Sequence, residues 1–509
     1  MKYLPRQQNK SMAVGITSIV LILAVQGLAA NLAAANPNQN EPRDAAIKDA
    51  IVKIYTVSSQ PDYFNPWRMS GPQDASGSGC MIAGHKILTN AHVIANHTFI
   101  QVRRNGQAKR YKASVLNVSH DADLALLTVD DQTFFTDITP LEFGEFAETQ
   151  QEVLVYGFPY GGDSLSITKG VLSRVEHQYY THSSYSLLAG QIDASINPGN
   201  SGGPVLVNGK IVGVVMEAYK AHQLENIGYM VPIPVIDHFL KDIEDGQYDG
   251  FPDLGIMIQE MENPDLKQKY GMAETQTGVF VVHVFPGSRA EGQIQEGDVL
   301  LAIAGYPIAD DGTVEFRPDE RTKYTYYVDI RQLGENVTVD VLRQGKIENL
   351  TLTLNQTKEK YLLVPLEKYE QMPRYVIYGG VVFSPLTKNL LEQWGPNWPN
   401  DAPLELVAEL SNWPDENRRE VVVALKVLAA DVNMGYHDIS TWIVSEVNGK
   451  KIKDFTEFFQ LVTQVTEPYV VFKDERGFQI VLDQQKAEES REKILQTYHI
   501  EYDRSPDLR

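Results

Sequence analysis

The chain has 509 residues, 43% of them hydrophobic, and its formal net charge is −21 at pH 7. Such a length is typical of about three domains at ~150 residues each, and the apolar share is sufficient for ordinary cores. The acidic balance argues against a general nucleic-acid binder, because the phosphate backbone attracts basic proteins.

Residues 1–35 have the composition of a secretory signal peptide. Basic residues at positions 2, 6 and 10 precede an uncharged, largely apolar run at 12–25, and three alanines at 33–35 offer a cleavage site. The run is shorter than the ~20 apolar residues that a membrane span needs. We therefore expect cleavage after Ala35 and a periplasmic or secreted protein. A retained membrane anchor that extends through Ala30 is the alternative.

Cys80 is the only cysteine, so neither an intrachain disulfide nor a cysteine-based zinc site can form. A secreted chain without disulfides is more typical of a bacterial periplasm than of animal extracellular fluid. We expect Cys80 to be a small buried residue in a strand. No metal and no organic cofactor is implied.

After a polar leader at 36–44, short β-like runs separated by turn residues indicate one mainly β domain at 45–245. The runs lie at 51–57, 79–82, 98–102, 113–118, 153–156, 205–207 and 211–216. This pattern is typical of a sandwich or a pair of barrels. The apolar spacing at 234–243 predicts a closing helix, which a turn-rich linker at 246–252 follows.

A weak internal repeat follows this domain. Residues 303–310 resemble 447–454, and residues 278–281 resemble 380–383, with an insertion near 389–420 in the second copy. We therefore expect two related modules at 251–356 and 375–485, joined by a linker at 357–374. The residues at 486–509 form an expected exposed, charged tail.

Three motifs bring together the residue types of a serine nucleophile site: Leu-Thr-Asn-Ala-His-Val at 88–93, Asp-Ala-Asp-Leu-Ala-Leu-Leu at 121–127 and Asn-Pro-Gly-Asn-Ser-Gly-Gly at 197–203. A serine hydroxyl is a weak nucleophile and needs a base. Ser201 is the expected nucleophile, His92 the base that later protonates the leaving amine, and Asp123 the carboxylate that holds the imidazole. Asp121 is the alternative acid.

The same serine motif predicts an oxyanion hole. The backbone N–H groups of Gly199 and Ser201 would form it, with Asn200 between them. Glycine at 199, 202 and 203 allows the tight turn that brings this backbone close to a substrate.

These motifs carry a family resemblance. Together with Gly-Ser-Gly at 77–79, Thr-Lys-Gly-Val-Leu-Ser at 168–173, the run 191–204 and Gly-Tyr-Met-Val-Pro at 228–232, they resemble the HtrA/Do-like (Deg) serine proteases. The resemblance implies a chymotrypsin-like double β-barrel followed by two PDZ-like domains. The run 378–386 in the second module is most similar to the plant Do-like branch.

The resemblance also implies a function: an ATP-independent serine endoprotease that degrades unfolded or misfolded proteins in envelope quality control and cleaves after small aliphatic residues. Ser195, six residues before the nucleophile, is not the acid that a preference for Lys or Arg would need, and Ile196 would narrow the pocket. Asp193 nearby leaves a basic preference open. The alternatives are a chaperone or peptide-binding scaffold with a resting, inactive site, and a dedicated processing protease for one partner.

The family pattern Leu-Gly-Ile recurs in the first module and predicts a loop for peptide C-termini. Asp253, Leu254, Gly255 and Ile256 are the expected carboxylate-binding residues. A purely structural β-module is the alternative. In the second module the corresponding run at 378–381 lacks this pattern, so it has either a ligand or an assembly role, and the insertion could cover its groove.

Members of the family commonly form trimers through an aromatic N-terminal segment. Tyr63, Phe64 and Trp67 could serve that role in a homo-oligomer built on trimers, and an intramolecular lid is the alternative.

Overall fold

The computed structural model describes residues 41–216 and 228–509, and the expected signal at 1–35 lies outside them. Arg43–Arg509 form one compact unit. Within the described residues, no helix is both long and apolar enough to cross a membrane.

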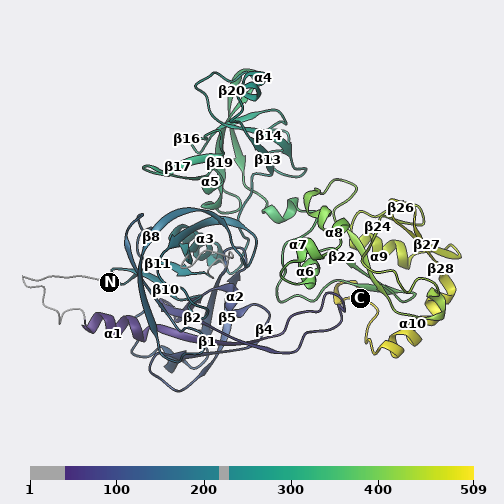
Figure 1. Ribbon diagram of the computed structural model, residues 1–509, viewed down its shortest axis with the longest axis horizontal. Coiled ribbons are helices and arrows are strands. Elements are labelled where there is room, and N and C mark those ends of the chain that lie inside the picture. The colour runs from purple at the N-terminus through teal and green to yellow at the C-terminus, as the bar shows by residue number, and fades with distance from the viewer. Residues whose placement is uncertain (1–40, 217–227) are drawn as a thin grey trace, which may run out of the picture. The chain divides into compact units, whose positions relative to one another are not determined.

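The first barrel is a closed sheet with the strand order β1-β2-β3-β6-β5-β4. Its strands β1, β2, β4 and β5 are labelled in Figure 1. Its strands are β1 (Ile51–Ser58), β2 (Gln73–Ile82), β3 (Lys86–Thr89), β4 (His97–Arg104), β5 (Tyr111–Ser119) and β6 (Leu124–Val129). Closure pairs β1 with both β2 and β4, which leaves no open edge. The apolar run of β6 is therefore almost completely buried, and Cys80 in β2 is buried as expected.

The second barrel closes in the order β10-β11-β12-β9-β8-β7. Its strands are β7 (Glu152–Gly157), β8 (Ser166–Tyr179), β9 (Ser186–Ile192), β10 (Pro204–Val207), β11 (Lys210–Val215) and β12 (Gly228–Pro232). The helices of this region are α1 (Glu41–Asp49), α2 (Ala91–Ile94) and α3 (Ile233–Asp242), with 3₁₀ turns at Gln132–Phe135 and Ile243–Asp245. The α3 helix is the closing helix that the apolar spacing predicted. The expected double β-barrel is thereby confirmed.

The first PDZ-like module has a sheet in the order β13-β14-β15-β19-β20, with β13 at one edge. Its elements are β13 (Ile256–Glu260), α4 (Pro264–Lys269), β14 (Val279–Val284), β15 (Val299–Ile303), β16 (Tyr306–Pro307), β17 (Thr313–Arg317), β18 (Glu320–Lys323), α5 (Tyr326–Asp329), β19 (Asn336–Arg343), β20 (Lys346–Thr353) and a 3₁₀ turn at Lys358–Tyr361. Alternating residues of β19 are buried, because successive side chains point to opposite faces of the sheet.

The second PDZ-like module contains two small sheets, β21-β22-β23-β24 and β26-β25-β27-β28. Its strands are β21 (Val376–Tyr378), β22 (Val381–Pro385), β23 (Val422–Val427), β24 (Trp442–Val444), β25 (Glu446–Val447), β26 (Lys450–Lys451), β27 (Tyr469–Lys473) and β28 (Gln479–Asp483). Its helices are α6 (Lys388–Leu391), α7 (Trp398–Asp401), α8 (Leu404–Ala408), α9 (Phe455–Thr463) and α10 (Gln484–Tyr498), with 3₁₀ turns at Glu392–Trp394, Glu409–Ser411, Asp431–Asn433 and Pro506–Leu508. The segment 389–420 thus forms short helices between β22 and β23.

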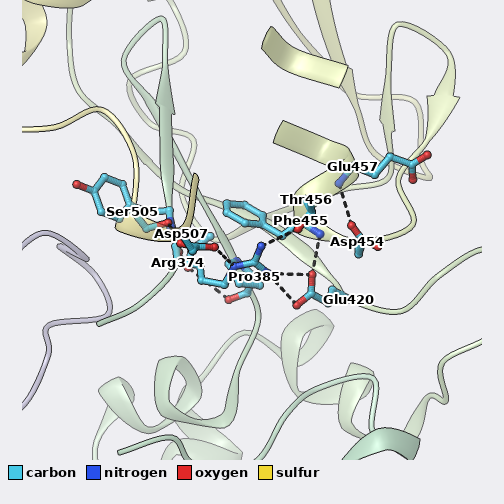
Figure 2. Close-up of polar contacts among 11 residues, drawn as sticks. Arg374, Pro385, Glu420, Asp454, Phe455, Thr456, Glu457, Ser505 and Asp507 are labelled. Carbon is cyan, nitrogen blue, oxygen red and sulfur yellow. Dashed lines mark hydrogen bonds and ion pairs between the residues drawn. The ribbon is translucent and has the colours of Figure 1, made fainter. Parts of the chain in front are cut away.

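The expected charged C-terminal tail at 486–509 is a folded element whose side chains are mostly exposed. The α10 helix covers most of residues 486–509 and buries Ala487 and Ile494, and Ile500 joins the same core as β22 and β23. Figure 2 shows how Arg374 fixes the end of the chain: its Nε donates to the Asp507 carboxylate at 2.7 Å, and its Nη1 contacts the Glu420 carboxylate. The C-terminal residues therefore belong to the second module.

The aromatic residues expected at an assembly surface lie within the chain. Phe64 packs edge-on against Trp394 with ring centres 4.8 Å apart, and Trp67 packs against Tyr375 at 5.9 Å. Tyr63 is buried in the same core. These three side chains therefore contact the second module within one chain.

Candidate active site

His92 and Asp123 are joined by two hydrogen bonds. The α2 helix begins directly after Asn90 and carries His92 in its first turn, while Asp123 lies in the turn before β6. The ring Nδ1–H of His92 donates to Asp123 Oδ2 at 2.8 Å, and its backbone N–H donates to Asp123 Oδ1 at 2.9 Å. Both carboxylate oxygens thus hold one histidine, which fixes the ring orientation and leaves Nε2 as the base nitrogen.

The backbone of Asp123 adopts a left-handed conformation with φ of 53°, which is uncommon for a residue other than glycine. The side chain of Asn90 donates to the Asp123 carbonyl oxygen at 2.8 Å, and Asp123 N–H donates to the His120 carbonyl oxygen at 3.1 Å. Such strain persists only where surrounding contacts determine it, and it is frequent at functional sites.

The two candidate acids have different partners. Burial by itself would raise the pKa of Asp123, but the His92 imidazole lowers it below its usual value. Asp121 instead accepts a hydrogen bond from the Tyr248 hydroxyl at 3.1 Å. Burial raises the pKa of Asp121 to about 6, although this hydrogen bond opposes the shift. The structure therefore places Asp123, and not Asp121, on the histidine.

Ser201 lies in a turn that accepts two hydrogen bonds from Ser78 of β2. Ser78 N–H donates to the Ser201 carbonyl oxygen at 2.8 Å, and Ser78 Oγ donates to the Gly199 carbonyl oxygen at 2.7 Å. A Cβ atom on Gly202 would lie 2.2 Å from Thr89 Oγ1, so only glycine fits against the strand that leads to His92. This packing brings the serine turn of the second barrel against the histidine segment of the first.

The serine turn also presents free backbone donors. Among the described residues, the N–H groups of Gly199 and Ser201 donate to no acceptor, whereas Asn200 N–H donates to the Asn197 carbonyl oxygen at 3.0 Å. Gly199 has a φ of 97°, and a Cβ there would lie 2.5 Å from the Phe158 carbonyl oxygen. The turn therefore has two unpaired backbone donors on either side of Asn200, whose own N–H is used within the turn.

The expected specificity residues lie on the segment before this turn. Ser195 is exposed, and its carbonyl oxygen accepts a hydrogen bond from Thr168. Ile196 packs so closely on Gly228 that a Cβ at that glycine would lie 2.1 Å from the isoleucine Cδ1. The exposed Asp193 carboxylate accepts the Val171 N–H at 2.6 Å through one of its two oxygens.

In the expected carboxylate-binding loop of the first module, one backbone N–H group is already bound by a side chain of the same loop. The Asp253 carboxylate accepts the Gly255 N–H at 2.7 Å. Leu254 and Ile256 are buried, and the Gly255 carbonyl oxygen accepts the Phe285 N–H. Strand β13 itself remains at the sheet edge, where a peptide strand could pair.

Sequence reasoning assigned no role to four residues that the structure gathers beside His92. His120, His182, Tyr369 and Glu370 contact one another, and a cleft of 650 Å³ is lined by His92, Asp123, His182 and Tyr369 among others. No local motif could reveal them, because Glu370 lies 250 positions from His120. Within the described part of the chain, no three His, Cys, Asp or Glu side chains are arranged to hold a metal ion.

The double barrel and the histidine–carboxylate pair define the class of trypsin-like serine peptidases, here joined to PDZ domains. A trypsin-like peptidase domain model matches residues 77–214, and a PDZ domain model matches residues 364–507. Protease Do-like 4, mitochondrial, of Arabidopsis thaliana is 38% identical over 460 residues, which cover 89% of this chain and 85% of that protein. The chain therefore belongs to the HtrA/Do-like serine protease family.

Further similarities extend along the same regions. Protease Do-like 2, chloroplastic, of Arabidopsis thaliana is 36% identical over 468 residues, covering 91% of this chain and 76% of that protein. The solved structure of the HtrA-type protease AlgW with tripeptide is 25% identical, with a TM-score of 0.49, and covers 62% of this chain and 96% of that one.

Proposed function

We propose that this chain is an ATP-independent serine endoprotease that degrades unfolded or misfolded polypeptides, with Ser201, His92 and Asp123 as its catalytic triad. One observation carries the proposal: both Asp123 oxygens hold His92, and the Ser201 turn packs on the strand that leads to this histidine. Membership of the Do-like family supports the same reaction class.

In the proposed reaction, Ser201 Oγ attacks the scissile carbonyl while His92 Nε2 takes its proton and later transfers it to the leaving amine. The Asp123 carboxylate stabilises the imidazolium that forms. The N–H groups of Gly199 and Ser201 bind the developing oxyanion, and the loss of one such donor typically lowers turnover by ~10²–10³.

A preference for small aliphatic residues is the proposed specificity. Ile196 lies against Gly228 beside the serine turn, and the Asp193 carboxylate is bonded to the backbone of Val171. An aliphatic wall beside the nucleophile favours a short apolar side chain over Lys or Arg. Mapping the bonds cleaved in an unfolded protein tests this, and cleavage mainly after Lys or Arg would contradict it.

The decisive experiment compares wild type with Ser201→Ala on reduced, unfolded casein and on folded control proteins. Hydrolysis of casein alone, lost in the variant, is the expected result. Suppression of client aggregation by both forms without cleavage would support the chaperone or scaffold alternative instead. Cleavage of one folded protein in preference to casein would support a dedicated processing protease.

Two further properties are proposals that rest on the sequence. The basic and apolar composition of residues 1–35 favours export with cleavage after Ala35 to a periplasmic or secreted location, although relatives named above carry mitochondrial or chloroplastic names. N-terminal sequencing of the protein from fractionated cells distinguishes cleavage from a retained anchor.

A homo-oligomer built on trimers is proposed from the family resemblance. Tyr63 is buried within the chain, whereas Phe64 and Trp67 are partly buried and keep exposed surface for a subunit contact. Light scattering on the purified protein tests this: a mass that is a multiple of three chains is expected, and a monomer would contradict it.

A further inference from the structure

The linker between the two PDZ-like modules contacts the protease domain close to His92. The Tyr369 ring stacks on His182 with ring centres 4.2 Å apart and on His120 at 4.3 Å. The Tyr369 hydroxyl donates to the His182 carbonyl oxygen. One linker side chain therefore covers both imidazoles and also holds the backbone of the β8–β9 loop.

Glu370, the next residue, binds both the imidazole pair and the segment that follows α2. Its Oε2 lies 2.8 Å from His120 Nε2, and its Oε1 accepts the Asn96 N–H at 2.7 Å. The Glu370 N–H donates in return to the Asn96 side chain at 2.8 Å. These two hydrogen bonds between Glu370 and Asn96 fix the linker close to α2, the helix that carries His92.

A hydrogen bond joins the two imidazoles. His120 Nδ1 and His182 Nε2 are 2.8 Å apart, and the other His120 nitrogen donates to a carboxylate, which can only accept. A single proton between the rings satisfies both nitrogens, so His182 is satisfied as a neutral ring. Burial lowers the pKa of His182 to about 3, which agrees with this arrangement.

His182 is placed where its charge would matter for catalysis. Its ring centre lies 6.1 Å from that of His92. Since His92 has to become an imidazolium during the reaction, a second positive charge at this distance would oppose the step, whereas a neutral ring does not. The titratable groups that face His182 are His92 from α2, His120 and Asp123 from the turn before β6, and Tyr369 and Glu370 from the linker.

We propose that Tyr369 and Glu370 are positioning residues of the protease site, which hold His182 as a neutral ring against the His92–Asp123 pair. This inference rests on the proposed function. Because both residues belong to the linker that leads into the second PDZ-like module, full activity then depends on the docking of this linker on the protease domain.

The test measures kcat and KM of the full chain on a fluorogenic peptide from pH 5 to pH 9, with wild type, Tyr369→Ala and the double variant Tyr369→Ala/His182→Gln. Loss of the tyrosine exposes His182, which then titrates near the ordinary histidine pKa of ~6.5. At pH 6 we expect kcat of Tyr369→Ala to fall about 10-fold relative to wild type, and at pH 8 only a few-fold. Removing the second imidazole in the double variant should restore much of the activity at pH 6.

Glu370→Gln provides a second variant and Glu359→Gln its matched control. Both glutamates lie between the two modules and pair with a basic side chain, but only Glu370 reaches His120. We expect a selective loss at low pH for Glu370→Gln and a wild-type profile for Glu359→Gln.

A pH-independent loss in Tyr369→Ala that His182→Gln does not reverse would overturn the proposal, as would a wild-type profile for both Tyr369→Ala and Glu370→Gln. Failure of the proposed function would look different, since wild type itself would then show no hydrolysis that depends on Ser201.

Discussion

At the scale of single residues, the orientation of His92 depends on one carboxylate. Asp123 is buried, and its two oxygens accept the ring and the backbone N–H of the same histidine. An amide at this position could donate to Nδ1 and would stabilise the wrong tautomer. We expect Asp123→Asn to lower kcat by about 10³–10⁴-fold at pH 7–8, as the loss of a triad carboxylate does in this class of site.

Asp121→Asn is the matched control, because Asp121 lies two positions away but binds Tyr248. Its kcat should remain within a few-fold of wild type. A large loss in this variant with an active Asp123→Asn would reverse the assignment of the acid. Kinetics on one peptide substrate decide between the two.

The same control variant makes a prediction about stability and pH. Burial raises the pKa of Asp121 to about 6, above its value of 3.8 in a model compound. A raised pKa means that its contribution to stability is present at low pH and is lost as the pH rises through about 6. We therefore expect Asp121→Asn to unfold at a higher urea concentration than wild type at pH 8, and this gain to shrink at pH 5. If the two proteins differed in urea midpoint by the same amount at pH 5 and pH 8, the raised pKa of Asp121 would be contradicted.

The His92–Asp123 pair could be predicted from the sequence because each of the two residues lies in a short motif of its own, and the proposed nucleophile Ser201 lies in a third motif. The structure adds residues that no motif marks. Ser78 clamps the serine turn although it lies 121 positions from Gly199, and Tyr369 reaches His182 across 187 positions. Contacts of this kind depend on how the modules pack, and one sequence does not encode such packing locally.

At the scale of elements, strand β13 and the loop before it form the expected peptide site. The loop differs from a free anion-binding loop, because the Asp253 carboxylate already accepts the Gly255 N–H. We expect Asp253→Ala to bind a peptide with an apolar C-terminus about 3–10-fold more tightly, since an internal competitor for this donor is lost. Fluorescence anisotropy with a labelled peptide measures the effect.

Asp340→Ala is the control for this prediction. Asp340 lies in β19 of the same module, and its carboxylate accepts a hydrogen bond from the Asn349 side chain. Its affinity should equal that of wild type. Weaker binding by Asp253→Ala would show that the aspartate supports the loop and does not compete with the peptide.

Elements with regular apolar spacing could be predicted, and the C-terminal element could not. The β strands and α3 show alternating or helical patterns in the sequence. The α10 helix is mostly polar or charged and buries only Ala487 and Ile494 along its length, so its composition is typical of a solvated tail. The chain end that follows this helix is held by Arg374, which donates to Asp507 across 133 positions of the sequence.

At the scale of the whole molecule, the second module is connected to both other parts of the chain. Trp394 packs on Phe64 of the protease domain, and Trp413 stacks on His283 of the first module with ring centres 4.6 Å apart. Trp394 and Trp413 belong to the insertion at 389–420, so this insertion forms contacts between modules, which no repeat comparison within the sequence could show.

The integrity of this second module depends on Arg374, whose guanidinium joins Asp507, Glu420 and Thr456 around the ring of Phe455 (Figure 2). Hydrogen bonds to charged groups contribute about 1.5–3 kcal/mol each at best, and the side chain is partly exposed, so we expect Arg374→Ala to lower the free energy of unfolding by about 1–3 kcal/mol. Lys493→Ala is the control: its pair with Asp431 in the same module is exposed on both sides, and its loss should change stability by less than about 0.5 kcal/mol. Tryptophan fluorescence during urea unfolding reports on this module selectively, because Trp394, Trp398, Trp413 and Trp442 lie within it and Trp67 packs on its Tyr375. Equal transitions for the two variants would show that the ion pairs in Figure 2 do not hold the C-terminal segment.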